Sequence, residues 1–232
     1  MTSSAVGKAP ASDSRERIID VAEDLFSRSG YGGTALADVA QGAGLSKASL
    51  FHHFASKAQL YCAVMERILT NLETQLTRAL ARGGRPTERL DRWIDTVLDV
   101  LAANPSHPGL LLRVLVDDAE LPAGLPEGKA ANDAMRRIGA TAVALLREGM
   151  DAGELRRASA AHTLQTLIGA TVHPLATGRF GEELLGRPVL APSEVRRRKT
   201  EVKALLRDGL HAPRTPHAPR APHAQRTKEG KR

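Results

Sequence analysis

Small, hydroxylated, cationic and aromatic residues gather between positions 46 and 57 of this 232-residue chain. They are Ser46, Lys47, Ala48, Ser49, Phe51, His52, His53 and Lys57. A lysine can donate hydrogen bonds to O6 and N7 of guanine. No Asp or Glu stands between Asp38 and Glu66, and a surface that lies on phosphate cannot tolerate carboxylates. These residue types therefore predict contact with a nucleic-acid duplex.

Two short helices joined by a tight turn would position these side chains. The first helix has one apolar face, made of Leu36, Val39, Ala40 and Ala43. Gly44 supplies the positive φ that the turn needs, and Ser46 stands where an N-cap belongs. Leu50 and Phe54 are four residues apart and face the core. The pattern predicts a helix-turn-helix, with Lys47 at the start of the second helix, where side chains reach the major groove.

A long third helix is expected to follow. Ser56 caps it, and Lys57 in its first turn opposes the helix dipole unless an outside anion such as a phosphate lies beside it. Leucine, valine or isoleucine recurs every four residues from Leu60 to Leu80. Such a helix would be shared by two domains. Movement at its far end would then move the second helix of the helix-turn-helix, which we call the reader helix.

Residues 15–66 resemble the DNA-binding domain of the TetR family of bacterial transcriptional regulators. The matching parts are the helix Ile18–Phe26, the link SGYGGTA, the segment DVAQGAGLSKASLFHHFASKAQL and the helix that follows. The resemblance implies an all-α fold, with an N-terminal three-helix helix-turn-helix domain followed by a larger helical ligand-binding and dimerisation domain. An abundance of Ala and Leu with only 3% aromatic residues also favours an all-helical chain.

The resemblance also implies roles for individual residues. Positions matching Ser46, Ala48 and Ser49 sit at the groove, and positions matching His52, His53 and Lys57 meet backbone phosphates. The chain departs from the family at two positions: Phe51 replaces a tyrosine whose hydroxyl meets a phosphate, and Ala35 replaces a threonine. We expect Thr34 to substitute as helix cap and phosphate contact. Two alternatives stay open, namely that Lys47 is a solvated lysine near the cap and that His53 is a partly buried histidine bonded to the backbone.

The predicted organisation has four parts. Residues 1–12 form a disordered extension, 13–60 the DNA-binding domain, 61–210 the effector-binding and dimerisation domain, and 211–232 a basic disordered tail. The net charge is +7, and the tail holds six basic residues against one acidic residue. The tail is either an electrostatic tether to DNA or an unselected extension.

Apolar stripes on the last two predicted helices, 159–177 and 193–210, suggest a dimer surface. The stripe residues chosen for it are Leu164, Leu167, Ile168, Val172, Val195, Val202, Leu205 and Leu206. In the family the last two helices of each subunit form a four-helix bundle across a two-fold axis. The alternative is that both stripes belong to the core of one subunit.

The middle helices, 87–150, would enclose a small-molecule pocket, as the resemblance implies. The predicted liners are Trp93, Met135, Met150 and Phe180, and His162 and His173 are buried polar candidates for the pocket or the dimer interface. A mostly apolar liner set favours an apolar or amphipathic effector.

Other classes of protein find less support. The chain has no phosphate-cradling Gly-rich loop, GxSxG, HExxH or CxxC pair, so we expect no enzyme, cofactor or metal site. A single cysteine, Cys62, fits a reducing cytoplasm, and residues 1–14 lack the apolar centre of a signal peptide.

We therefore expect a cytoplasmic, dimeric, sequence-specific transcriptional regulator. It would be a repressor released from a near-palindromic operator by its effector. The alternatives are an activator of the same fold and a nonspecific DNA-binding protein driven by the tail.

Overall fold

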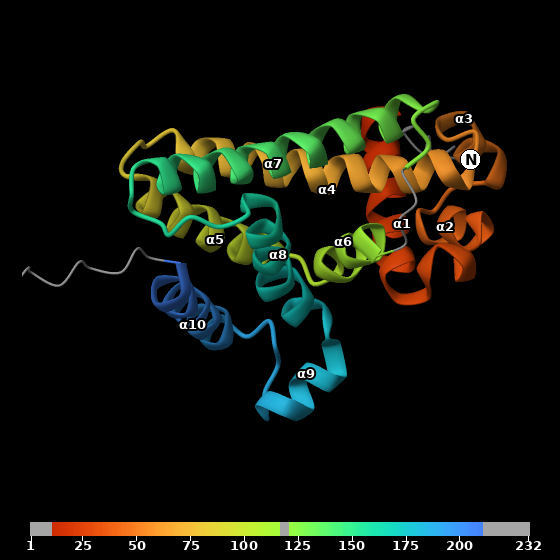
Figure 1. Cartoon of the computed structure of the whole chain (residues 1–232). Coiled ribbons are helices and arrows are strands. Elements are labelled where there is room, and N and C mark those ends of the chain that lie inside the picture. The colour runs from red at the N-terminus through yellow and green to blue at the C-terminus, as the bar shows by residue number, and fades with distance from the viewer. Residues whose placement is uncertain (1–10, 117–120, 211–232) are drawn as a thin grey trace, which may run out of the picture.

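The computed structural model describes residues 11–116 and 121–210, and these residues are organised as ten α-helices with no strand (Figure 1). The helices are α1 Ala11–Gly33, α2 Leu36–Gly42, α3 Lys47–His53, α4 Lys57–Leu80, α5 Pro86–Ala102, α6 Ser106–Val116, α7 Pro126–Asp151, α8 Ala160–Ala176, α9 Gly178–Leu185 and α10 Pro192–Leu210. The predicted all-α fold is confirmed. Of the extension expected at 1–12, residues 1–10 lie outside the described residues, as does the tail expected at 211–232. Residues 11 and 12 belong to α1, which therefore begins two residues before position 13. Within the described part, no helix is long and apolar enough to cross a membrane.

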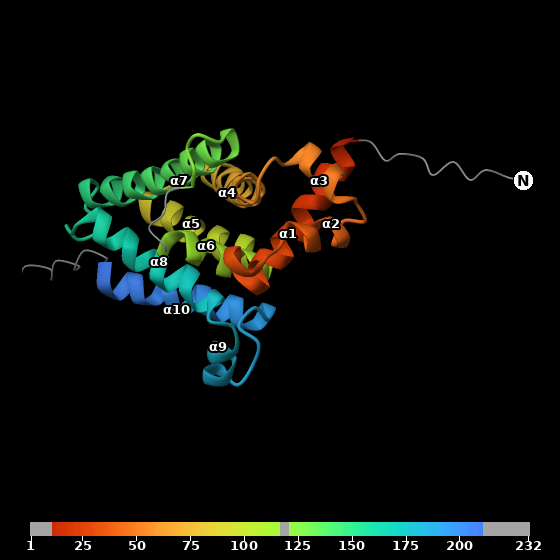
Figure 2. The same cartoon turned by 90° about the vertical axis from the view of Figure 1, so that its right-hand side faces the viewer.

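Helices α1, α2 and α3 form a small unit at one end of the molecule, around the first turns of α4 (Figures 1 and 2). Its core is made of the fully buried side chains Ile18, Phe26, Val39, Leu50, Phe54 and Leu60. Helix α1 breaks at Gly30, which has a φ of 70° and a ψ of 175°, and a last turn continues to Gly33. Between α2 and α3, Gly44 adopts a φ of 68°. Its N–H donates to the carbonyl of Gln41, and that of Leu45 donates to the carbonyl of Ala40, so this turn satisfies two carbonyls at the end of α2.

Helix α4 runs out of the small unit and packs against α7 and α5 in the larger one (Figure 1). Its buried face includes Leu60, Val64, Ile68, Leu72 and Leu76, which are the four-residue repeat of the sequence. The helix is therefore shared by both units, as its length predicted.

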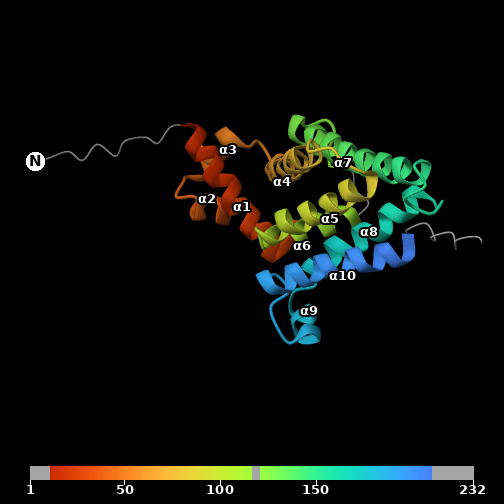
Figure 3. The same cartoon turned by 90° about the vertical axis from the view of Figure 1, so that its left-hand side faces the viewer.

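Helices α8 and α10 pack on α5 on the side away from α4 (Figures 1 to 3). Helix α9, which connects α8 to α10 in the chain, projects away from the other helices. Three basic residues of α10 face three acidic residues of α5: Lys199 lies 2.5 Å from Asp99, Lys203 2.8 Å from Asp95 and Arg207 2.9 Å from Asp91. Both sets are spaced by four residues, so the pairs form a ladder along the two helices. Helix α9 was not expected, because the glycines and prolines of 178–192 indicate a simple connection.

A largely buried carboxylate joins the small unit to the larger one. Glu23 of α1 accepts hydrogen bonds from the Ser106 hydroxyl at 2.5 Å and from Arg67 of α4 at 2.5 Å, and its Oε1 lies 3.1 Å from Nε2 of His107. Arg67 also bonds Asp20 of α1 at 2.5 Å. Burial raises the pKa of Glu23, but hydrogen bonds from His107, Ser106 and Arg67 outweigh it and lower the pKa from 4.5 to about 2. We call Asp20, Glu23, Arg67, Ser106 and His107 the joint cluster; it ties α1 to α4 and to the first turn of α6.

Replacing Gly44 by alanine should destabilise the protein by about 1 kcal/mol, because an L-residue is disfavoured at a φ of 68° even where space is free. Gly109→Ala is the matched control, since Gly109 lies inside α6 without a positive φ and an added Cβ there meets nothing within 4 Å. The control should be neutral or slightly stabilising. Urea unfolding checks both, and equal effects of the two changes would contradict the role of the turn.

Glu23→Gln should remove stability that depends on pH. Because the pKa of Glu23 is lower in the folded chain than its ordinary value of 4.5, its contribution is present above pH 4.5 and is lost as the pH falls towards 2. The shift corresponds to about 3 kcal/mol, so the variant should lose stability of this order at pH 7 and converge on the parent in acid. Urea unfolding at several pH values measures this. Glu183→Gln, in the exposed pair Arg179–Glu183, is the control and should leave the pH dependence of the free energy of unfolding unchanged. If Glu23→Gln lowered the free energy of unfolding equally at all pH values, the ionised carboxylate would not be the source of the stability.

Candidate nucleic-acid interface and internal cavity

The N-terminus of α3 is held by its own serines. Ser46 is the N-cap, and its Oγ accepts a hydrogen bond from the backbone N–H of Ser49 at 3.1 Å. The two hydroxyls lie 2.9 Å apart, so one donates to the other. Lys47, Ala48 and Ser49 follow the cap and are exposed. The first turn of α3 is therefore a fixed, solvent-facing platform whose backbone N–H dipoles favour an anion.

The rest of α3 presents its aromatic and imidazole side chains. Phe51 is 42% exposed, and Nζ of Lys47 lies 5.9 Å from the centre of its ring. His52 is exposed and His53 is half-buried, with their ring centres 5.8 Å apart at an angle of 70°. Leu50 on the opposite side is fully buried, so the core fixes which face of α3 meets the solvent.

Lys57 is anchored within the chain. Ser56 caps α4 by accepting from the N–H of Gln59 at 3.1 Å. Nζ of Lys57 donates to the carbonyl of Gly32 at 3.2 Å and lies 4.7 Å from the centre of the Tyr31 ring. These partners offset the cost of a lysine at a helix N-terminus, for which the sequence had suggested an outside anion. They also hold the ammonium beside the last turn of α1.

The prediction that Thr34 caps α2 is wrong. Ala35 is the N-cap and makes no side-chain cap, while Thr34 is 3% exposed and its hydroxyl donates to the carbonyl of Gly30 at 2.8 Å. The kink at Gly30 turns that carbonyl towards Thr34, which closes the link between α1 and α2. Ala35 itself is exposed at the start of α2.

A cavity of about 130 Å³ lies between five helices of the larger unit. It is lined by Leu69, Leu72, Trp93, Val97, Leu111, Leu115, Met135, Ile138, Gly139, Leu164, Ile168, Thr171 and Val172. None of these side chains is ionisable, and the Thr171 hydroxyl donates to the carbonyl of Leu167 at 2.8 Å. The cavity can therefore take an apolar molecule without breaking a charge pair.

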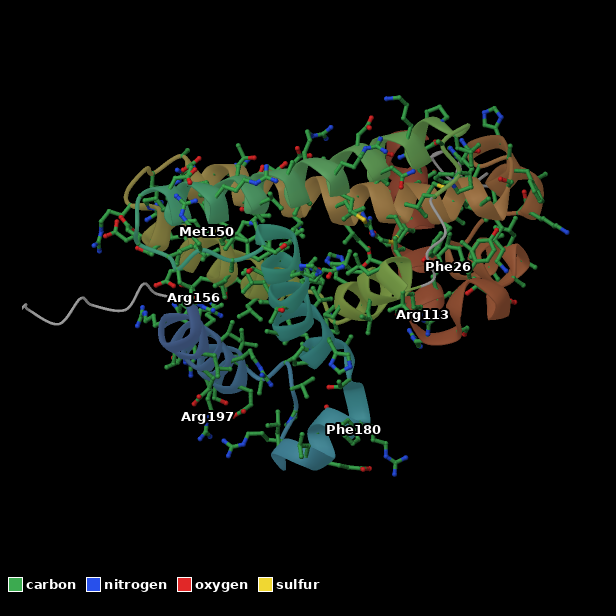
Figure 4. All side chains as sticks on the ribbon, viewed as in Figure 1. Phe26, Arg113, Met150, Arg156, Phe180 and Arg197 are labelled. Carbon is green, nitrogen blue, oxygen red and sulfur yellow. The ribbon has the colours of Figure 1, made fainter. Side chains whose placement is uncertain are left out.

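Two of the four predicted liners, Trp93 and Met135, lie on this cavity, and two do not. Met150 is buried near the far end of α7, and Phe180 is 68% exposed on α9 (Figure 4). Phe180 was misplaced because the sequence did not indicate a projecting helix. His162 and His173, the buried polar candidates, are both exposed on α8. The sequence missed the liners from α4 and α6, whose leucines carry no signal that separates a cavity wall from a core.

The apolar stripes of α8 and α10 are used mainly inside the subunit, which corrects their assignment to a dimer surface. Leu167, Val172, Val195 and Val202 are buried, Leu164 and Ile168 line the cavity, and Leu206 is half-buried against the core. Leu205 alone of the set is exposed, at 72%. An amphipathic pattern predicts that a helix has an apolar face, but it does not predict whether the same subunit or a second subunit buries that face.

Comparisons with known proteins agree with this geometry. Residues 18–64 match the family model of bacterial regulatory proteins of the tetR family. The chain is 30% identical over 94 residues to the HTH-type transcriptional activator FasR and 25% identical over 116 residues to the HTH-type transcriptional repressor KstR, both of Mycolicibacterium smegmatis. The first match covers 40% of this chain and 43% of FasR, and the second covers 50% of this chain and 57% of KstR. The chain thus spans about half the length of these curated relatives, which are regulators and not enzymes.

Among solved structures, the ketosteroid transcriptional regulator KstR2 of Mycobacterium tuberculosis superposes with a TM-score of 0.69 at 20% identity, over 88% of this chain and 97% of that one. This likeness extends the shared fold over both units. Residues 18–64 are thus a helix-turn-helix segment of the tetR family of bacterial regulatory proteins, and the superposition shows the fold of the helices that follow it.

Proposed function

We propose that this protein is a dimeric, sequence-specific regulator of transcription that binds a near-palindromic operator and releases it when a small apolar effector fills the cavity. The observation that carries the proposal is the capped, exposed first turn of α3 with Lys47, Ala48 and Ser49, in a stretch free of carboxylates from position 39 to 65. Lys47 and Ser49 would contact bases, Ala48 a thymine methyl, and Ser46, His52, His53 and Lys57 the backbone phosphates.

A dimer follows from the size of this surface. One helix of seven residues touches few base pairs, so specific binding requires a second α3 at a half-site one helical turn away. The exposed faces of α8 and α10 are the proposed interface. They present His162, Gln165, Thr166, Gly169, His173 and Leu205. The set is mostly polar, and Thr166 and Gly169 are small enough to let two helices approach.

The effector would act through α6 and α4. Leu111 and Leu115 of α6 and Leu69 and Leu72 of α4 line the cavity, while His107 and Arg67 on the same helices belong to the joint cluster with Glu23. A ligand that moves these helices therefore moves α1 and changes the separation of the two reader helices. We favour a repressor that leaves the operator when the effector binds. Activation by the same fold remains the alternative, since one matched relative is an activator and another a repressor.

Lys47→Ala should abolish sequence preference more than it lowers nonspecific binding. We expect random duplex DNA selected at near-physiological salt to yield a near-palindrome, and the variant to lose about 1–3 kcal/mol for that site, the usual value of a good base contact. Arg147→Ala is the matched control, because it removes one exposed positive charge in the last two turns of α7, and α7 ends far from α3 (Figure 1). If both variants weaken the operator and unrelated DNA equally, Lys47 reads no base.

The same selection separates the proposal from a tail-driven DNA binder. Protein truncated after residue 210 should keep its preference for the selected site. Loss of all binding on truncation, with no site enriched by the full chain, would favour the nonspecific alternative.

Leu205→Glu should convert the dimer into monomers, because Leu205 is the one large apolar side chain that α10 exposes among those the structure describes, and the change places a charge there. We expect the apparent mass in light scattering to halve at micromolar protein and operator affinity to fall with it. Val116→Glu is the control, since Val116 is 68% exposed on α6, outside the proposed interface, and should leave the mass unchanged. A monomeric parent, or a dimer that survives Leu205→Glu, would place the interface elsewhere.

A further inference from the structure

Among the described side chains that line the cavity, one buried polar group has no hydrogen-bond partner in the part of the chain that the structure describes. Trp93 of α5 lines the cavity and is 3% exposed, and its indole Nε1 makes no hydrogen bond with any residue that the structure describes. A buried N–H without an acceptor costs free energy, and such groups are rare in folded proteins. An orphaned donor on the wall of a ligand-sized space is explained if the ligand supplies the acceptor.

The other polar group on the wall cannot play this part. The Thr171 hydroxyl donates its hydrogen to the carbonyl of Leu167 at 2.8 Å, as a helical threonine often does. The remaining lining side chains are aliphatic, apart from the thioether of Met135 and the hydrogen of Gly139. Among the described residues, the indole N–H is thus the one side-chain donor that the wall can offer to a ligand.

The wall also sets the charge of the ligand. No lysine, arginine or histidine lines the cavity, so a carboxylate or phosphate inside it would be desolvated without a counter-ion. The cost of burying an unpaired charge far exceeds the gain from one N–H donor. A neutral acceptor, such as a ketone, aldehyde or ester carbonyl, avoids that cost and satisfies the indole.

We propose that Trp93 is the residue that determines effector specificity, and that the effector is a neutral, compact apolar molecule whose single carbonyl oxygen accepts a hydrogen bond from the Trp93 indole. This inference rests on the proposed function, because it takes the cavity to be the effector site. It adds the class of ligand, which neither the fold nor the apolar character of the cavity defines.

Three compounds with the same hydrocarbon body test the proposal. They are tert-butylcyclohexane, which has no acceptor, 4-tert-butylcyclohexanone, which has a neutral acceptor, and 4-tert-butylcyclohexanecarboxylate, which has a charged one. Trp93 is the sole tryptophan of the chain, so its fluorescence reports directly on the cavity. Calorimetry with the full-length parent, Trp93→Phe and Thr171→Val supplies affinities that do not depend on the fluorophore.

We expect the ketone to shift the emission of Trp93 to the red and to bind the parent about tenfold more tightly than it binds Trp93→Phe, the order expected for one buried hydrogen bond. The hydrocarbon should bind both proteins equally. Thr171→Val should leave the affinity for the ketone unchanged, and the carboxylate should bind weakest.

Equal affinity of the ketone for the parent and Trp93→Phe would overturn the assignment of the indole as donor. A carboxylate that binds more tightly than the ketone would overturn the neutral class, as would the failure of all three compounds to bind. Operator binding is measured separately with ligand-free protein. A protein that selects an operator but fails these tests loses only this inference, whereas one that selects no operator loses the proposed function.

Discussion

The carboxylate of Glu23 is the interaction on which the arrangement of the two units depends. It is largely buried on α1 and is reached by donors from two other helices, Arg67 of α4 and Ser106 of α6, with His107 of α6 beside it. A buried carboxylate without these partners would be costly, so α1 is stable in this position only while α4 and α6 keep their places. Because α2 packs on α1 and α3 packs on α2, the direction of the reader helix depends on the same contacts.

The same two helices bound the cavity, which gives the joint a second role. On α4, Arg67 precedes the cavity residue Leu69 by two positions, and on α6 His107 precedes Leu111 by four. These separations are at most about one helical turn, so a rigid helix cannot shift at the cavity without shifting at the joint. Arg113 of α6 also lies against the backbone of Gly30, where α1 breaks. The units are thus connected by packed, charged contacts rather than by a flexible linker.

The helix-turn-helix could be predicted from short-range sequence patterns. The contacts between helices far apart in the chain could not. Ser46, Ser56 and Gly44 could be assigned from sequence because a cap or a positive φ depends on neighbours a few residues away. The partner of Glu23 is 84 positions along the chain at His107, and nothing in the local pattern marks either residue. Thr34 failed as a cap because Ala35, one residue later, is the N-cap of α2, and the Thr34 hydroxyl is buried and donates to the carbonyl of Gly30. The stripes of α8 and α10 were real, but periodicity could not tell a neighbouring helix from a second subunit.

The free energy that the joint cluster contributes is of the same order as the coupling free energy that a ligand can supply. Coupling between two sites in a protein is typically about 1–3 kcal/mol, and a ligand can supply only the difference between its affinities for the two states. The pKa of Glu23 indicates that the joint stabilises its ionised form by about 3 kcal/mol. A ligand that displaced α6 would have to offset the part of this that Ser106 and His107 supply, whereas a small rotation that lengthens one of their bonds to Glu23 costs less. Under the proposed function, an effector of modest size would act by tilting α6 about an intact Glu23 contact, and the bonds that hold α1 in place would be the pivot of this movement.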